Sequence, residues 1–297
     1  MRKLSLYIQC LRPKQWVKNL VLLAGLIFSR NLFEPGMAVR AFGALGIFCL
    51  LSGAIYVFND LRDYTRDKVH PSKRSRPIAS GRVSRVEAAV LGLLVAVIGL
   101  ALASLINISF LWVSLAYVFL QIAYSLGLKH MVVLDVLIIS LGFVLRAIAG
   151  VEALKDLDPG VVISPWLLVC TLFLALFLGF SKRRHELNLL EDTASQHRKT
   201  LDDYSAPFLD AMIVAVAAAT LIAYAIYTIW GETVVKFGTD KLIYTVPFVV
   251  YGLFRYMYLV MLKNRGGSPS EVLLSDVPLI VDIVLWIIVA GLLIYAR

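Results

Sequence analysis

Long apolar stretches recur along the whole chain and leave few folds open to it. A helix needs about 20 mostly apolar residues to cross the hydrocarbon core of a bilayer. Nine stretches come near that length: residues 16–30, 38–58, 86–106, 109–127, 131–150, 164–181, 207–230, 242–262 and 277–296. With 60% hydrophobic residues, 16% charged residues and a mean hydropathy of +0.81, the chain is far more apolar than a soluble domain. We therefore predict an all-α, multi-pass membrane protein, a single integral-membrane domain over residues 1–297 in which about nine helices surround a cytoplasm-facing cavity.

The distribution of Lys and Arg predicts the orientation of these helices. Most of the 29 basic residues fall in alternate connections: the N-terminal segment, 59–85, Lys129, 182–199 and 263–265. Because positive residues are retained on the cytoplasmic side, we expect the N-terminus inside and the C-terminus outside. The first residues carry no signal-peptide pattern, so we expect the first span to be retained. The net charge of +9 then reflects topology and attraction to anionic lipid head groups, which favours the cytoplasmic (inner) membrane and no nucleic-acid partner.

The most informative polar segment is NDLRDYTRDKVHPSKRSRPIASGR at residues 59–82. Asp60, Asp63 and Asp67 are spaced i, i+3, i+7, which on a helix places three carboxylates in one stripe. Such a stripe is stable only when cations neutralise it, and hard oxygen ligands suit Mg²⁺. Asn59 adds a further ligand type. We therefore predict a magnesium site here; the alternative is a solvated loop whose acids are balanced by neighbouring bases.

Three bases that follow the acidic residues add a second chemistry to this loop. Lys73, Arg74 and Arg76 lie within reach of the predicted metal and are candidates for holding phosphate groups, with Arg suited to bidentate contacts. Taken alone, they are better explained as ordinary positive residues of a cytoplasmic loop. Their clustering beside the aspartates favours a site that holds a metal together with the phosphates it bridges.

A second charged connection, residues 182–206, occupies the matching place after the sixth span and predicts a pseudo-repeat, with active-site loops at 59–85 and 182–206. Lys182, Arg183 and Glu186 fall on one helix face there, and we expect them to meet the first cluster across the cavity. The alternative is a simple topology signal.

Further polar residues lie in or near the predicted spans. Asp135 is about one turn into its span and follows Tyr124 and Lys129, so we expect all three at the mouth of the cavity. Arg146 lies deeper, and we expect it to pair with an acid, Glu152 or Asp282. Lys14 and Lys18 lie around the start of the first span, where such residues are typical of an interfacial anchor. Lys18 is also a candidate for binding a lipid phosphate.

These motifs resemble the UbiA-type intramembrane prenyltransferase superfamily. NDLRDYTRD followed by KRSRPIASG is similar to its first aspartate-rich motif, matched at Asn59, Asp60, Asp63 and Asp67, whereas the second motif is replaced by a basic segment. A narrower branch is more similar along the whole chain, the decaprenyl-phosphate phosphoribosyltransferases. The segments that carry this resemblance are RPKQWVKN (12–19), YSLGLKH (124–130), LRAIAG (145–150), GFSKRRHEL (179–187) and RKTLDDY (198–204).

The resemblance implies a reaction and partners. The donor would be 5-phosphoribosyl 1-diphosphate, the acceptor a polyprenyl phosphate, and the products polyprenylphosphoryl-5-phosphoribose and diphosphate, in cell-envelope biosynthesis. Asp60, Asp63 and Asp67 would act with Mg²⁺. The residues implied for substrate are Lys14, Lys18, Asn59, Lys73, Arg74, Arg76, Tyr124, Lys129, Asp135, Lys182, Arg183 and Glu186.

Two other functions stay open from the sequence. One is a prenyltransferase that moves an isoprenoid from a prenyl diphosphate to an aromatic or other small acceptor. The other is a membrane transporter, although the charges gather at one face instead of the midplane where transporter sites lie. Small residues at 215–220 (AVAAAT) permit close helix contacts within the chain or between copies of it, so a homo-oligomer also stays open.

Overall fold

The computed structural model describes residues 2–71, 73–191, 203–263 and 269–295, and every regular element in these ranges is a helix. Within these described ranges, eight helices are long and apolar enough to cross a membrane, and they match eight of the nine predicted spans. The chain divides into two compact units, each described here by itself. One comprises Met1–Lys129 with Gly142–Val162, and the other His130–Leu141 with Ile163–Arg297.

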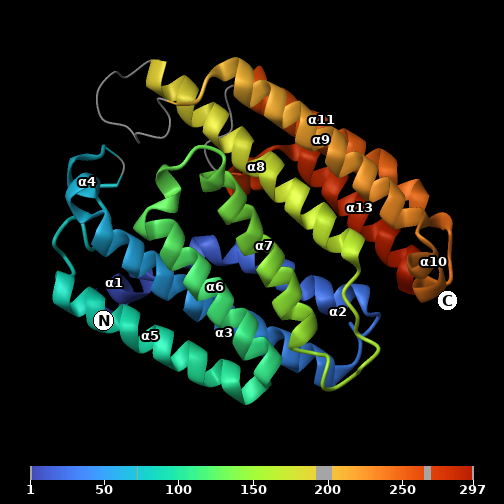
Figure 1. Cartoon of the computed structure of the whole chain (residues 1–297), viewed down its shortest axis with the longest axis horizontal. Coiled ribbons are helices and arrows are strands. Elements are labelled where there is room, and N and C mark those ends of the chain that lie inside the picture. The colour runs from blue at the N-terminus through green and yellow to red at the C-terminus, as the bar shows by residue number, and fades with distance from the viewer. Residues whose placement is uncertain (1, 72, 192–202, 264–268, 296–297) are drawn as a thin grey trace. The chain divides into compact units, whose positions relative to one another are not determined.

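The first unit is organised around α3 (Pro35–Arg62), the most buried of its long helices. Helices α5 (Arg85–Ile106) and α6 (Ile108–Leu126) pack beside α3, as Figure 1 shows in blue-green and green. Phe48 on α3 packs against Phe110 and Tyr117 on α6, with ring centroids 5.7 Å and 5.2 Å apart. The shorter helices are α1 (Arg2–Cys10), α2 (Ala24–Phe28) and α4 (Tyr64–Val69), and the chain returns to this unit in the second part of α7 (Leu134–Glu152).

The second unit is built on the long antiparallel pair α8 (Pro165–Glu191) and α9 (Ala206–Ile229). Helix α11 (Val246–Met261) packs on this pair and on α13 (Val277–Tyr295). Figure 1 labels α11 and α13. Phe177 and Tyr256 meet in its core with ring centroids 5.5 Å apart. The elements that connect these helices are α10 (Gly231–Phe237), a short 3₁₀ helix (Lys241–Thr245) and α12 (Pro269–Ser275).

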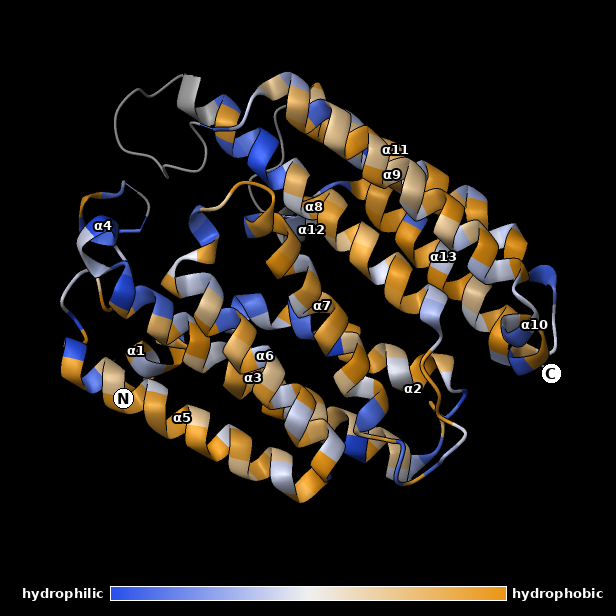
Figure 2. Ribbon diagram, in the orientation of Figure 1, coloured by the Kyte–Doolittle hydropathy of each residue, from blue (hydrophilic) through white to orange (hydrophobic). Residues whose placement is uncertain are grey.

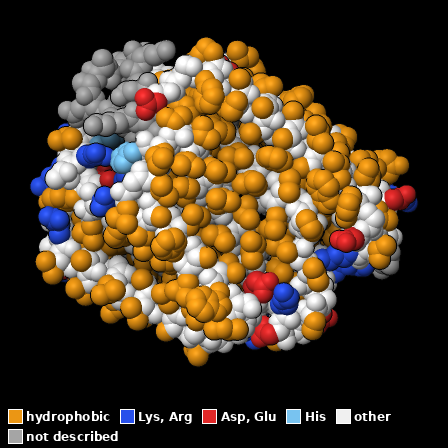
Figure 3. All heavy atoms as spheres, viewed as in Figure 1, with side chains coloured by type: hydrophobic (Ala, Val, Ile, Leu, Met, Phe, Trp, Pro, Cys, Tyr) orange, Lys and Arg blue, Asp and Glu red, His pale blue; other side chains and the backbone are white. Residues whose placement is uncertain are grey.

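Side-chain oxygens define where several spans begin. Ser84 and Glu87 form a capping box at the start of α5, and Asn107 accepts a hydrogen bond from the Phe110 N–H at the start of α6. Beyond these caps most residues of the long helices are hydrophobic, as the orange colour of the ribbons in Figure 2 shows. Large apolar side chains are exposed on them, including Leu105 at 79% and Phe119 at 75%, and such side chains cover most of the face shown in Figure 3. An exposed apolar surface of this kind is suited to lipid rather than water.

The predicted first span, residues 16–30, differs from the other eight. Residues Pro13–Leu23 form an eleven-residue 3₁₀ helix, η1, and α2 then adds five α-helical residues. A 3₁₀ helix rarely exceeds three or four residues, because its hydrogen-bond geometry is poorer than that of an α-helix. Contacts from outside the segment must therefore stabilise η1.

Candidate active site

Two buried carboxylates near the end of α3 converge on one arginine. Asp60 lies on the last turns of α3 and Asp67 on α4, and both are buried. Nη1 of Arg76 donates to Oδ1 of Asp60 at 3.1 Å and to Oδ2 of Asp67 at 2.6 Å. Two buried carboxylates in one place repel each other unless positive charge neutralises them. Arg76 therefore holds together two of the three predicted metal ligands.

A second arginine contacts the same acid, and sequence reasoning did not select it as a ligand. Arg12 donates from Nη2 to Oδ1 of Asp60, and its guanidinium lies 5.1 Å from the centre of the Tyr56 ring. Burial lowers the pKa of Arg12, and the charge of Asp60 opposes that shift. Arg12 also has a positive φ of 53° directly before Pro13, a backbone conformation that is rare for a residue with a side chain. The only sequence signal for this residue is its place at the head of RPKQWVKN.

Asp63 faces a different base, which corrects the predicted stripe of three carboxylates. Helix α3 ends at Arg62, so Asp63 occupies the turn before α4 and its side chain leaves the line of Asp60. Nζ of Lys129 donates to both carboxylate oxygens of Asp63, at 2.6 Å and 2.8 Å. The three acids are therefore divided between two partners: Arg76 contacts Asp60 and Asp67, and Lys129 contacts Asp63.

Asn59 takes part in the contact between α3 and α6. Its Oδ1 accepts a hydrogen bond from the Ser125 hydroxyl, while Arg62 donates to the backbone carbonyls of Ser125 and Leu126 at 3.1 Å and 3.0 Å. Tyr124 lies half-buried on the same turn of α6. These contacts fix the end of α3 against the end of α6 and so position the carboxylates.

The remaining bases of the first loop differ in exposure. Arg76 contacts the carboxylates directly, Lys73 is half-buried, and Arg74 is exposed. All three lie in the connection between α4 and α5, close in sequence to Asp67. Their positive charge would allow an anion to bind beside the carboxylates of Asp60 and Asp67.

The chemistry of the donors fits a magnesium ion. Among the described residues no group of three or more His, Cys, Asp or Glu side chains is arranged to hold a metal. However, Asp60 and Asp67 aim one carboxylate oxygen each at the single point where Nη1 of Arg76 lies. Mg²⁺ commonly takes one or two protein carboxylates and completes its shell with waters and substrate phosphate oxygens. A pair of convergent carboxylates is therefore a suitable partial site.

The second unit holds a buried acid with two partners from distant segments. Asp135, at the start of α7, has no exposed surface. Its Oδ2 accepts from Nε of Arg183 at 2.7 Å, and its Oδ1 accepts from the Tyr204 hydroxyl at 2.7 Å. Arg183 also donates from Nη1 to Glu186 at 2.5 Å. Three segments of this unit therefore meet at Asp135.

Tyr204 is a residue that sequence reasoning did not select, although it ends the RKTLDDY motif. Its oxygen also accepts a hydrogen bond of 2.7 Å from the backbone N–H of Val133, a β-branched residue with a φ of +67°. Burial raises the pKa of Tyr204, and its hydrogen bond to Asp135 raises it further. Tyr204 thus links a strained backbone position to the buried ion pair.

The basic segment at the end of α8 is balanced by acids. Nζ of Lys182 lies 3.7 Å from Oε1 of Glu186. Arg183 pairs with Asp135 and Glu186. Arg184 pairs with Asp210. Lys182, Arg183 and Glu186 therefore lie together, with Asp135 as the buried member of the group, and their expected contact with substrate stays a prediction. The rest of the predicted loop, residues 192–202, lies outside the described residues.

The predicted lipid-phosphate ligands lie on η1. Lys14 is exposed and Lys18 is half-buried. In a 3₁₀ helix, residues four apart point about 120° from each other, whereas in an α-helix they share a face. The structure therefore does not place Lys14 and Lys18 side by side.

Arg146 differs from its expected pairing with Glu152 or Asp282. Its three hydrogen bonds go to neutral acceptors: Nε to Asn19 Oδ1, Nη1 to the Gly142 carbonyl and Nη2 to the Tyr117 hydroxyl. Glu152 instead contacts Lys155 at 3.3 Å, and Asp282 belongs to the second unit.

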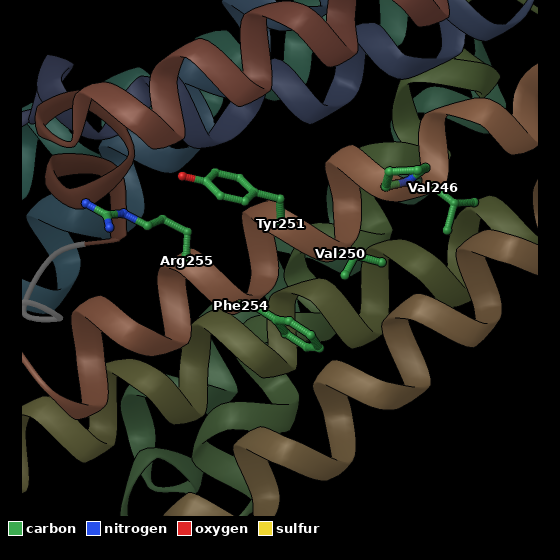
Figure 4. Close-up of a pocket in the computed structure, with 6 residues that line it drawn as sticks. Val246, Val250, Tyr251, Phe254 and Arg255 are labelled. Atoms are coloured by element: carbon green, nitrogen blue, oxygen red, sulfur yellow. The ribbon is translucent and has the colours of Figure 1, made fainter.

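An apolar hollow of about 520 Å³ lies on α11. Figure 4 shows its lining residues, with Tyr251 and Arg255 at one end and Val246 at the other. Arg255 pairs with Asp276 through hydrogen bonds of 3.1 Å and 2.9 Å. Its lining suits a lipid chain, and it contains none of the predicted site residues.

The chain is similar in sequence to a known family of membrane proteins. Residues 20–274 match the model of the UbiA prenyltransferase family. The decaprenyl-phosphate phosphoribosyltransferase of Corynebacterium glutamicum is 35% identical over 296 residues, which cover 97% of this chain and 86% of that protein. The decaprenyl-phosphate phosphoribosyltransferase of Mycolicibacterium smegmatis is 33% identical, covering 97% and 92%.

Solved structures agree in fold. A UbiA homologue from Archaeoglobus fulgidus, solved with GPP and Mg²⁺, aligns with a TM-score of 0.70 and 19% identity over 98% of this chain and 100% of that one. A digeranylgeranylglyceryl phosphate synthase aligns with a TM-score of 0.69 and 17% identity over the whole of both chains. At these identities the likeness concerns the fold alone.

Proposed function

The chain belongs to the UbiA prenyltransferase family, and we propose that it transfers 5-phosphoribose from 5-phosphoribosyl 1-diphosphate to a polyprenyl phosphate. One observation carries this proposal: relatives named for phosphoribosyl transfer to decaprenyl phosphate are similar over nearly the full length of both chains. The products are polyprenylphosphoryl-5-phosphoribose and diphosphate.

The first unit is proposed to hold the donor diphosphate. Asp60 and Asp67, with Asp63 beside them, are the ligands for Mg²⁺, which when bound would act as a Lewis acid on the diphosphate oxygens. When the donor enters, Arg76 exchanges its carboxylate partners for phosphate oxygens and is joined by Lys73 and Arg74. Arginine forms bidentate contacts with phosphate as readily as with carboxylate. The pairing of Arg76 with Asp60 and Asp67 supports this exchange.

The sugar and its 5-phosphate are assigned to Tyr124, Lys129, Asp135, Lys182, Arg183 and Glu186. A phosphoribosyl donor carries a phosphate that a prenyl donor lacks, and this additional charge calls for basic side chains. Lys182 is the partly exposed base of its cluster, whereas Arg183 is buried on Asp135. We therefore assign phosphate contact to Lys182 and assign to Arg183 the role of fixing the end of α8.

The acceptor is a phosphate monoester, already anionic, so its attack needs no strong general base. The bond between C1 of the ribose and the diphosphate oxygen breaks as a bond from the lipid phosphate oxygen to C1 forms, and diphosphate leaves with the electron pair. Lys14 and Lys18 are proposed to bind the acceptor phosphate at the bilayer surface. The residues of the chain contribute positioning and electrostatic stabilisation.

Nine spans with the N-terminus in the cytoplasm complete the proposal. An eleven-residue 3₁₀ helix at 2.0 Å per residue, followed by five α-helical residues, extends about 30 Å, which equals the thickness of the hydrocarbon core. The segment η1 with α2 thus supports a first span despite its short sequence. The charged loops then lie on the cytoplasmic side of the cell membrane. Labelling of single cysteines at Ser5 and Glu232 from either side of sealed vesicles tests this topology, because the two positions should label from opposite sides only if the first span crosses the membrane.

Incubation of the purified protein with radiolabelled 5-phosphoribosyl 1-diphosphate and polyprenyl phosphate tests the activity. Label should enter the lipid extract, stop entering it when a chelator removes divalent cations, and return with added Mg²⁺. A parallel incubation uses labelled prenyl diphosphate with a small aromatic acceptor, and a third follows uptake into vesicles. Transfer of the prenyl label, or uptake without any lipid product, would replace the proposed reaction with one of the two other functions.

A further inference from the structure

Arg146 is a buried cation whose described contacts are all with neutral groups. It is 5% exposed, and its guanidinium lies over the rings of Tyr117 and Phe143 at 4.8 Å and 5.0 Å. A charge within a membrane span costs on the order of 2.5 to 3.5 kcal/mol on insertion scales, and such residues are usually functional. The hydrogen bonds of Arg146 indicate what it does.

The contact with Asn19 connects Arg146 to the 3₁₀ helix. Oδ1 of Asn19 accepts from Nε of Arg146 at 2.8 Å, while Nδ2 donates to the Ser52 hydroxyl at 3.0 Å and to Sγ of Cys49 at 3.4 Å. Asn19 is itself buried. One side chain of η1 is therefore held between α7 and α3 by polar contacts, in a region otherwise filled by apolar groups.

One 3₁₀ turn further on, the backbones of η1 and of the following α2 approach the backbone of α7 closely. A Cβ on Gly150 would lie 1.9 Å from the Leu22 carbonyl oxygen, and one on Gly25 would lie 2.7 Å from the Gly150 carbonyl. Asn19 and Leu22 are three residues apart, so they share one row of a 3₁₀ helix. Both are buried, and this row faces α7 and α3.

A 3₁₀ helix has three residues per turn, so its side chains form three rows. When the row of Asn19 and Leu22 is fixed, the directions of the other two rows are fixed as well. Lys14, Val17 and Leu20 form an exposed row, whereas Gln15, Lys18 and Val21 form a half-buried one. If the segment relaxed to an α-helix, Lys14 and Lys18 would turn to a common face. The orientation of both lysines thus depends on whether Asn19 stays in place.

We propose that Arg146 is a positioning residue for the acceptor: through Asn19 it holds η1 in its 3₁₀ form and thereby sets where Lys14 and Lys18 present their charges. This inference rests on the assignment of these lysines to the acceptor phosphate. It predicts that a residue deep within α7 controls affinity for a polyprenyl phosphate and leaves affinity for the donor unchanged.

The experiment compares variants of the full-length protein in detergent. Arg146→Gln and Asn19→Leu remove the contact, Asn19→Asp keeps an acceptor for Arg146, and Arg40→Gln is the matched control. Arg40 donates to the Ile106 carbonyl and pairs with Asp156. Its substitution therefore removes the partly buried contacts of an arginine that does not touch η1. The measurements are retention of radiolabelled polyprenyl phosphate by immobilised protein, KM for each substrate, and kcat.

We expect Arg146→Gln and Asn19→Leu each to weaken polyprenyl phosphate binding and raise its KM about tenfold, equivalent to about 1.4 kcal/mol. The donor KM and kcat should stay within about twofold, and Asn19→Asp and Arg40→Gln should resemble the wild type. The double variant should be no worse than Asn19→Leu alone, because Arg146 is proposed to act through Asn19.

Three outcomes would overturn the inference: equal changes in both KM values, additive effects in the double variant, or loss of folded protein in both Arg146→Gln and Asn19→Leu. The last would make the contact a requirement of the fold alone. The binding measurement needs no turnover. Absence of phosphoribosyl transfer by the wild type would therefore reject the proposed function, whereas polyprenyl phosphate binding that is independent of Arg146 would reject this inference.

Discussion

Oδ1 of Asp60 and Oδ2 of Asp67 share one hydrogen-bond donor, Nη1 of Arg76. Two carboxylates from successive helices thus meet at a single positive group, which marks the point where a bound cation would gain most from their charge. This relationship gives the acidic segment its proposed role and leads to the first prediction.

Asp60→Asn should reduce transfer by at least about 100-fold, because an amide keeps the shape of the side chain but loses the charge that a metal requires. Rates of transfer to polyprenyl phosphate at saturating Mg²⁺ measure the effect. Asp156→Asn is the control, since Asp156 also pairs with an arginine, Arg40, but outside the candidate site. Equal rates in the two variants would remove Asp60 from the metal site.

Lys129→Met should raise the donor KM about tenfold and lower the thermal midpoint, because it removes the ammonium group that donates to both oxygens of the Asp63 carboxylate. Asp63→Asn/Lys129→Met should recover stability but not activity. A thermal scan with steady-state kinetics separates the two effects.

The control Lys155→Met removes an exposed pair with Glu152, which is worth at most about 1 kcal/mol. Full recovery of activity in the double variant would show that Asp63 has no part in the reaction.

Local features of this protein follow from its sequence, and contacts between distant segments do not. The apolar stretches locate eight long helices within a few residues, since each must cover the same bilayer thickness. Asp60, Asp67 and Arg76 are close in sequence, so their meeting was predictable. Contacts such as Lys129 with Asp63 depend on how whole helices pack, and periodicity carries no information about that.

Two further features show why the sequence pattern was insufficient. The apolar content of the first span is the same for a 3₁₀ helix as for an α-helix, so the sequence did not reveal that Lys14 and Lys18 point apart. Arg146 was expected to find an acid because a buried charge usually does. In the structure, neutral oxygens of Asn19, Gly142 and Tyr117 surround it instead.

Tyr204→Phe should destabilise the second unit by about 1 to 3 kcal/mol, because it leaves the Val133 N–H and one Asp135 oxygen without their partner. The effect should depend on pH. Burial raises the pKa of Tyr204 above the value of 10.0 expected for the unfolded chain. The stabilisation is therefore complete below pH 10 and declines as pH rises above it, where the unfolded tyrosine ionises first.

The difference in thermal midpoint between wild type and Tyr204→Phe, measured from pH 7 to pH 11, checks that prediction. It should stay constant up to about pH 9 and shrink above about pH 10. Tyr251→Phe on the exposed face of α11 provides the control and should show a small difference at every pH. A difference in thermal midpoint between wild type and Tyr204→Phe that stays constant up to pH 11 would contradict a raised pKa of the Tyr204 hydroxyl.

Gly150→Ala should prevent the first unit from folding, whereas Gly46→Ala should be tolerated. A Cβ on Gly150 would lie 1.9 Å from the Leu22 carbonyl oxygen and 2.8 Å from its carbonyl carbon, and a backbone cannot move aside as a side chain can. A Cβ on Gly46, in the interior of α3, meets no atom within 4 Å. Alanine there should stabilise the helix by about 0.5 to 1 kcal/mol. The yield of monodisperse protein in detergent compares the two variants directly. Because η1 contacts α7 at this glycine, a Gly150→Ala protein that folds and binds polyprenyl phosphate normally would show that the close approach of Leu22 to Gly150 is not needed to position η1.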